Sequence, residues 1–161
     1  MIIILKIILV GIGATIILDI WTALLKLFKV KSLDYKYVGR WIANFRKGIF
    51  VYDNILKTDP VPGELVIGWI AHYLIGTSYA FLLLIFYGSE WVENPVIVPA
   101  LIIGIVTVVS PLFIMQPAFG FGFASSKLPD PNIRRLKSLS THIVYGIGLY
   151  LAALLVNYLW K

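Results

Sequence analysis

The sequence contains no cysteine among its 161 residues. That absence excludes disulfide bonds, thiolate metal sites and thiol nucleophiles. Charged residues are also scarce, at 14% of the chain, whereas a soluble domain has about 25%. Three long stretches, 66–88, 95–116 and 141–160, contain no Asp, Glu, Lys or Arg at all. Long uncharged stretches are typical of membrane-spanning helices, so the scarcity of charge indicates an integral membrane protein.

The signatures of common enzyme sites are missing as well. The chain has no G-x-S-x-G nucleophile elbow, no H-E-x-x-H zinc motif, no G-x-x-x-x-G-K-[ST] phosphate loop and no D-x-x-D acidic pair. We therefore expect no cofactor and no metal site, and the sequence does not favour an enzyme. The basic residues lie next to the apolar stretches, which makes nucleic acid an unexpected partner.

Hydrophobic residues make up 60% of the chain, above the roughly 45–50% of a soluble domain. They concentrate in four stretches, each long enough to cross a bilayer, which takes about 20 residues. The first stretch is too long for a signal peptide, and we expect it to remain as a span. The sequence predicts an all-α integral membrane protein with one four-helix transmembrane domain covering 1–161. The predicted spans are about 2–28, 66–88, 95–116 and 141–160.

The distribution of Lys and Arg predicts the orientation in the membrane. Twelve of the fourteen basic residues lie in the two long connections, 26–65 and 117–140, while the short link 89–94 has none. Basic loops stay on the cytoplasmic side. We therefore expect both termini and the short link on the outer side of the membrane. Trp91 is expected in an outer aromatic belt and Tyr73 in an inner one.

The first long connection predicts an amphipathic helix over about 33–47. Ser32 or Asp34 suits its start, and Gly48 suits its end. Its apolar residues recur at helical spacing, and basic residues occupy the rest of the wheel. Such a helix lies in the membrane plane against anionic phospholipids at the cytoplasmic face. Simple anchoring and a platform for a lipid substrate both remain open. The apolar positions are Val38, Trp41, Ile42, Phe45 and Ile49, and the basic ones are Lys36, Arg40 and Lys47.

Ionisable and polar residues in the predicted cytoplasmic half suggest a buried polar site. An acidic side chain at a helix centre costs about 2.5–3.5 kcal/mol on insertion scales, so it usually faces the bundle and has a partner. The site is either a substrate, proton or ion site, or a structural hydrogen-bonded cluster that fixes helix register. No H-x-x-x-H spacing supports a metal. The candidate residues are Asp19, His72, Gln116, His142 and Arg40.

The end of the third span suggests a second site. Pro111 predicts a kink, because proline removes a backbone hydrogen bond and clashes with the preceding turn. Asp130 can cap a helix that begins at Pro131. Glycines between these points allow backbone N–H groups to converge on an anion or a lipid head group. A loop anchored at the interface is the alternative. The candidate contacts are Gly120, Gly122, Ser125, Arg134 and Arg135.

Long ordered motifs across the chain resemble the bacterial membrane-protein family catalogued as domain of unknown function 2938. The motifs are "GIGATIILDIW", "SLDYKYVGRW", "GELVIGWIAHYLIG", "VPALIIGIVTVVSPLFIMQPAFGFGFASS" and "RRLKSLSTHIVYGIGLYLA". The resemblance implies a bacterial inner-membrane protein. It implies no activity, so no catalytic role is carried over from it.

Three functions remain open from the sequence. The first is a small transporter or permease-like protein, working as a homo-oligomer, with a buried polar site that opens to the cytoplasm. The second is an intramembrane enzyme that acts on a lipid-like substrate. The third is a non-catalytic subunit or assembly factor of a membrane complex. Asp19 in the first span favours transport.

Overall fold

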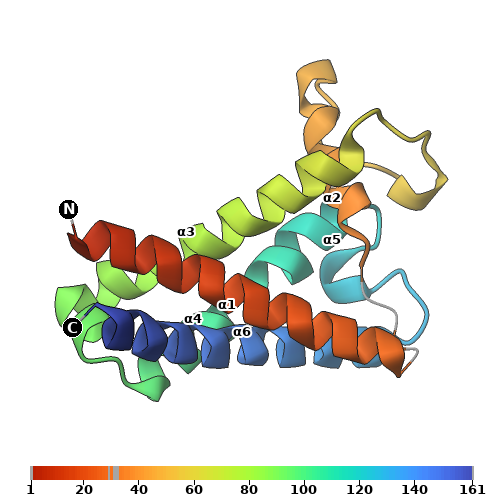
Figure 1. The fold of residues 1–161 in the computed structure, drawn as a ribbon. Helices are drawn as coiled ribbons and strands as arrows, with labels where there is room; N and C mark the ends of the chain where they lie inside the picture. The colour runs from red at the N-terminus through yellow and green to blue at the C-terminus, as the bar shows by residue number, and fades with distance from the viewer. Residues whose placement is uncertain (1, 29, 31–32, 161) are drawn as a thin grey trace. The chain divides into compact units, whose positions relative to one another are not determined.

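The computed structural model describes residues 2–28, 30 and 33–160, and these form helices and connecting loops (Figure 1). Four helical segments are long and apolar enough to cross a membrane: Ile2–Leu27, Glu64–Glu93, Ile97–Ala118 and Pro131–Leu159. The prediction of an all-α protein with four such helices is confirmed. The chain divides into two compact units. Unit 1 contains 1–32, 73–107 and 140–161, and unit 2 contains 33–72 and 108–139.

Unit 1 is built from α1 (Ile2–Leu27), the later part of α3 (Glu64–Glu93), α4 (Ile97–Thr107) and most of α6 (Pro131–Leu159). The start of α1 and the end of α6 lie at the same end of this unit (Figure 1). Fully buried apolar side chains fill its centre. They include Ile7, Val10, Ala14, Ala80, Leu83 and Leu149.

Small residues set the helix crossings of unit 1. A Cβ at Gly104 would lie 2.5 Å from the carbonyl oxygen of His142 and 2.7 Å from the Cα of Gly146, so α4 and α6 approach backbone to backbone. Between α1 and α3, a Cβ at Gly11 would lie 2.6 Å from the Cα of Thr77. Helices in lipid gain no hydrophobic drive from one another, and close packing of this kind is what holds them together.

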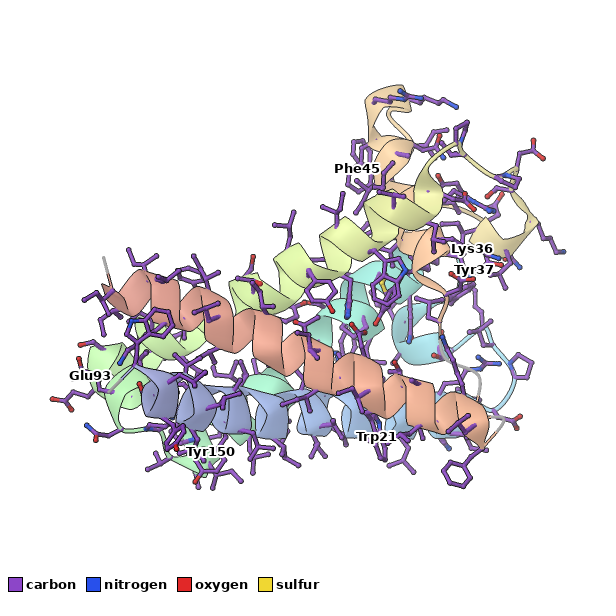
Figure 2. All side chains as sticks on the ribbon, viewed as in Figure 1. Trp21, Lys36, Tyr37, Phe45, Glu93 and Tyr150 are labelled. Carbon is purple, nitrogen blue, oxygen red and sulfur yellow. The ribbon has the colours of Figure 1, made fainter. Side chains whose placement is uncertain are left out.

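At the end of unit 1 that holds the start of α1 and the end of α6, side-chain hydrogen bonds join α1, α3 and α6. Asn157 Nδ2 donates to the carbonyls of Val92 (2.7 Å) and Glu93 (3.0 Å), and Lys6 Nζ donates to Asn157 Oδ1 (2.9 Å). Figure 2 shows Glu93 at this end of the unit. These bonds satisfy the last carbonyls of α3, which have no partner within the helix.

Two details of this end differ from the predictions. Gly88, at φ 72° and ψ −176°, interrupts α3, and the expected link 89–94 begins as a short helical turn that ends at Glu93. Trp91 is only 4% exposed and donates from Nε1 to the Val96 carbonyl (2.9 Å). Its predicted place in an outer aromatic belt is wrong, because its ring packs into the core of the unit instead of facing lipid.

Unit 2 begins with α2 (Tyr35–Ala43), followed by the 3₁₀ turns η1 (Phe45–Lys47) and η2 (Ile55–Lys57) and by the start of α3. Asp34 caps α2 by accepting from the Lys36 N–H, as predicted, while Ser32 lies outside the described residues. Gly48 ends η1 in the left-handed region, also as predicted. Figure 2 labels Tyr37, near the start of α2, and Phe45, the first residue of η1.

The rest of unit 2 comes from the end of the third span and the loop after it. The π-helix η3 (Ser110–Met115) and the short α5 (Gln116–Ala118) follow α4, and η4 (Phe123–Ser125) lies in the loop before α6. The kink predicted at Pro111 takes the form of this π-helix, whose wider turn accommodates a proline. Helix α6 begins at Pro131, ten residues before the predicted span at 141, as the Asp130–Pro131 signal indicated.

Candidate functional site

Asp19 lies within the first span and has a partner on α3. It stands eight residues before the end of α1 at Leu27, or about 12 Å along the helix. The Tyr73 hydroxyl donates to Asp19 Oδ2 at 2.9 Å, and both residues are half-buried. Unit 1 therefore holds an acidic side chain, hydrogen-bonded to a phenol, on a helix that is long and apolar enough to cross a membrane.

The close approach of α1 and α3 brings these two side chains together. A Cβ at Gly76 would lie 2.2 Å from Thr15 Oγ1, and the crossing at Gly11 is equally tight. Thr15 is fully buried and donates to its own helix at the Gly11 carbonyl (2.8 Å). These two contacts fix the antiparallel register of α1 and α3. Asp19 follows Thr15 by one turn of α1, and Tyr73 precedes Gly76 by about one turn of α3, so the two side chains lie at the same level.

His142 is held separately, between α6 and α4. Its Nδ1 lies 3.0 Å from Thr107 Oγ1, and the Thr107 hydroxyl donates to the Gly104 carbonyl (2.7 Å). Because the proton of that hydroxyl is donated to the Gly104 carbonyl, the hydroxyl oxygen accepts a hydrogen bond from His142 Nδ1–H. The contact thus fixes the tautomer of His142 and ties α6 to α4 at their glycine crossing.

His72 lies in unit 2, within an aromatic cluster. The Tyr35 ring stacks on its imidazole with centroids 4.1 Å apart, and the Tyr35 hydroxyl is 3.1 Å from His72 Nε2. Trp69 packs edge-on against Tyr35 at 4.8 Å. Gly68 makes this contact possible, since a Cβ there would collide with the Tyr35 carbonyl oxygen at 2.0 Å. The cluster joins α2 to the first turns of α3.

Arg40 is the most fully bonded polar group of unit 2. Its Nε and Nη2 donate to the two carboxylate oxygens of Glu64, each at 2.8 Å, and its Nη1 donates to the Thr58 carbonyl at 2.6 Å and to the Ile55 carbonyl at 3.2 Å. The hydrogen bond with Glu64 raises the pKa of Arg40 above its usual value. The guanidinium is 4% exposed. Its assignment to the basic side of the amphipathic helix is therefore wrong, whereas its burial agrees with its place among the candidates for a buried polar site.

Gln116 pairs with the loop that follows it. Ser125 Oγ donates to Gln116 Oε1 at 2.9 Å, and Ser125 is 1% exposed. This bond links α5 to η4, so two residues that were assigned to different candidate sites belong to one contact.

Two N–H groups of the glycine loop donate to carbonyls within the chain. The Gly120 and Phe121 N–H groups donate to the carbonyls of Pro117 (3.0 Å) and Gln116 (2.9 Å), which closes α5. At Gly122, φ is 75°, and a Cβ would lie 2.3 Å from Ser126 Oγ. The loop is built around these tight approaches.

Arg134 and Arg135 are exposed and hold the same loop from outside. Arg134 Nε donates to the Pro129 carbonyl and Arg135 Nε to the Ala124 carbonyl, both at 2.8 Å. Arg135 Nη1 also donates to Asn132 Oδ1 at 3.0 Å. Their bonds within the chain shape the loop at the start of α6.

The structure divides the predicted polar set between the two units. Asp19 and His142 belong to unit 1, and Arg40, His72 and Gln116 belong to unit 2. The sequence did not pair Asp19 with Tyr73 or Gln116 with Ser125. Tyr73 was assigned to an interfacial belt, although its hydroxyl donates to Asp19. Among the described residues, no three His, Asp or Glu side chains are grouped so as to hold a metal ion.

Comparison with known proteins places the chain in a family. The family model described as "Protein of unknown function (DUF2938)" matches residues 8–156, so the chain belongs to the DUF2938 family. No curated protein and no solved structure matches it. The match includes residues of both units and most of each of the four membrane-length helices.

Proposed function

We propose that this member of the DUF2938 family is a small transporter-like membrane protein in which Asp19 is the proton-binding group. The observation that carries the proposal is the hydrogen bond from Tyr73 to Asp19 inside two membrane-length helices. Acidic residues at such depth mark ion or proton pathways more often than they serve as structural groups, because their insertion costs about 2.5–3.5 kcal/mol.

The chemistry of the pair suits proton exchange. A carboxyl group can gain a proton when it faces hydrocarbon and release it when water reaches it. The Tyr73 hydroxyl donates to the carboxylate and can turn to accept from the protonated acid, so it can serve both states. The Thr22 hydroxyl donates to the backbone carbonyl of Asp19 (3.0 Å) and not to its carboxyl group.

The pathway we propose runs along the flank of α1 and α3. Unit 1 is filled at its centre by fully buried Ile7, Val10, Leu83 and Leu149, which leaves Asp19 on the flank, half-buried. A second copy packed on this flank would enclose the carboxyl group and form the other wall of the pathway. The working unit in this proposal is therefore a homo-oligomer.

The membrane and the orientation form part of the same proposal. Twelve of the fourteen basic residues lie in 26–65 and 117–140, which favours a cytoplasmic location for these segments. Both termini would then lie outside a bacterial inner membrane. Asp19 stands nearer the end of α1 than its start, so it would be closer to the cytoplasmic surface.

Proton flux into proteoliposomes tests the proposal without knowledge of the transported solute. The full chain is reconstituted with the pH-sensitive dye pyranine inside, and a potassium diffusion potential is imposed. We expect proton entry above that of protein-free vesicles, and its loss in Asp19→Asn. Tyr73→Phe should slow entry and keep it measurable, because the carboxyl group remains while its hydrogen-bond donor is removed.

Ser78→Ala provides a matched control. Ser78 is an exposed residue of α3 whose hydroxyl donates only to its own helix, at the Leu74 carbonyl (2.7 Å). The control should retain wild-type flux. Proton entry that is equal in the wild type and in Asp19→Asn at matched protein density would refute the role of Asp19.

A further inference from the structure

A small cleft in unit 2 lies between the end of α2 and the start of α3. Its volume is about 240 Å³. This is below the roughly 300–1,000 Å³ of sites that enclose a whole drug-sized ligand, so the cleft fits a head group and not an entire lipid. Its lining residues are Ile42, Ala43, Arg46, Val61, Pro62 and Ile67.

Arg46 is the single charged residue that lines this cleft. Within the described part of the chain, its guanidinium takes part in no hydrogen bond and no ion pair. The contrast with Arg40 is sharp, because every side-chain nitrogen of Arg40 is bonded to Glu64 or to a carbonyl. The donors of Arg46 therefore remain available to a ligand from outside the protein.

The surroundings of the cleft are those of a membrane surface. Ile67 is the fourth residue of α3, which is long and apolar enough to cross a bilayer, so the cleft lies where a span ends. Three apolar residues of the same unit, close in sequence to the residues that line the cleft, are exposed. Their exposed fractions are 56% for Phe50, 62% for Val66 and 57% for Ile70. Apolar side chains next to a basic group are typical of contact with anionic lipid.

We propose that this cleft binds the head group of an anionic phospholipid. The Arg46 guanidinium holds the phosphate, for which its planar fork of donors is well matched. The apolar lining from Val61, Pro62 and Ile67 takes the glycerol and the start of an acyl chain. Charge complementarity selects an anionic lipid over a zwitterionic one. The inference does not depend on the transport proposal, because it concerns other residues in unit 2.

Native mass spectrometry of the full chain tests this site. The protein is purified in detergent and titrated with phosphatidylglycerol or phosphatidylcholine of equal chain length. We expect tighter binding of phosphatidylglycerol, and a weakening of about five-fold in Arg46→Gln, as one basic side chain contributes about that factor at an anionic surface. Arg46→Lys should retain the preference for the anionic lipid and bind with intermediate strength, because it keeps the charge and loses the fork.

Lys57→Gln is the matched control, since Lys57 is an exposed basic residue of η2 in the same unit and outside the cleft. It should bind phosphatidylglycerol as the wild type does. Equal losses in Arg46→Gln and Lys57→Gln would overturn the proposal in favour of a diffuse effect of charge. Competition by soluble glycerol phosphate at the concentration of the lipid would also overturn it, because the apolar lining would then contribute nothing. Far-ultraviolet circular dichroism confirms that each variant keeps its helices.

Discussion

Replacement of Arg40 by methionine should destabilise the protein more than removal of an exposed charge in unit 2. The variant has an unbranched apolar side chain, shorter than that of arginine, and leaves the Glu64 carboxylate without its two 2.8 Å hydrogen bonds. Removing one partner of a buried ion pair costs about 3–5 kcal/mol, because the remaining charge is uncompensated. Arg40 is 4% exposed and the Glu64 side chain 12% exposed, so this range applies.

The Lys36–Asp34 pair provides the comparison within the same unit. These groups are 3.4 Å apart and their side chains are 39% and 48% exposed. Exposed pairs contribute about 0–1 kcal/mol, so Lys36→Met should cost no more than that. The double variant Arg40→Met with Glu64→Met should recover most of the loss, because it removes both charges from the buried site.

Reversible unfolding in mixed detergent micelles, followed by tryptophan fluorescence, measures these differences. The hydrogen bond with Glu64 raises the pKa of Arg40 above its ordinary value. A base with a raised pKa contributes stability that is present below the ordinary value and is lost only as pH rises through the raised one. The contribution of Arg40 should therefore be constant from pH 6 to pH 9. A loss in Arg40→Met no larger than that in Lys36→Met would refute the reasoning.

Three further predictions concern packing and topology. Gly104→Ala should destabilise the protein in the same unfolding assay by about 1–3 kcal/mol, because the new methyl group meets the backbone of α6 at His142 and Gly146. In that assay, Gly120→Ala should lower the free energy of unfolding more than Gly48→Ala does. Both glycines have positive φ, but only a Cβ at Gly120 meets backbone, 2.1 Å from the Asp53 carbonyl oxygen. Since the chain has no cysteine, Ser126→Cys and Ser89→Cys give single labelling sites; in intact bacteria a membrane-impermeant maleimide should label Ser89→Cys alone. Labelling of Ser126→Cys alone would reverse the proposed orientation.

The spans were predictable because they depend on local sequence. Uncharged apolar stretches of sufficient length identify membrane helices whatever their neighbours are. Local signals also located the cap at Asp34, the left-handed Gly48 and the helix start at Pro131. The same signals did not identify Trp91 as a core residue, because an interfacial ring and a buried ring have the same sequence context, and only packing within unit 1 distinguishes them.

The partners of the polar residues were not predictable from sequence. Periodicity places a residue on a helix face, yet the register between two helices decides which side chain it meets. Asp19 meets Tyr73 because Gly11 and Gly76 set that register. Helical periodicity placed Asp19 and the neighbouring His72 in one polar cluster and did not point to the Tyr73 hydroxyl. The Arg40–Glu64 pair could not be predicted from helical periodicity for a related reason, because the two residues lie 24 positions apart and the connection between them has no regular period.

A pH jump on proteoliposomes adsorbed to a solid-supported membrane tests the central claim most directly. The measurement records the charge that moves when protons bind within the membrane, and it requires no transported solute. We expect a transient current in the wild type and in Ser78→Ala, and its loss in Asp19→Asn. A current of the same size and time course in Asp19→Asn would contradict the claim that Asp19 is the proton-binding group.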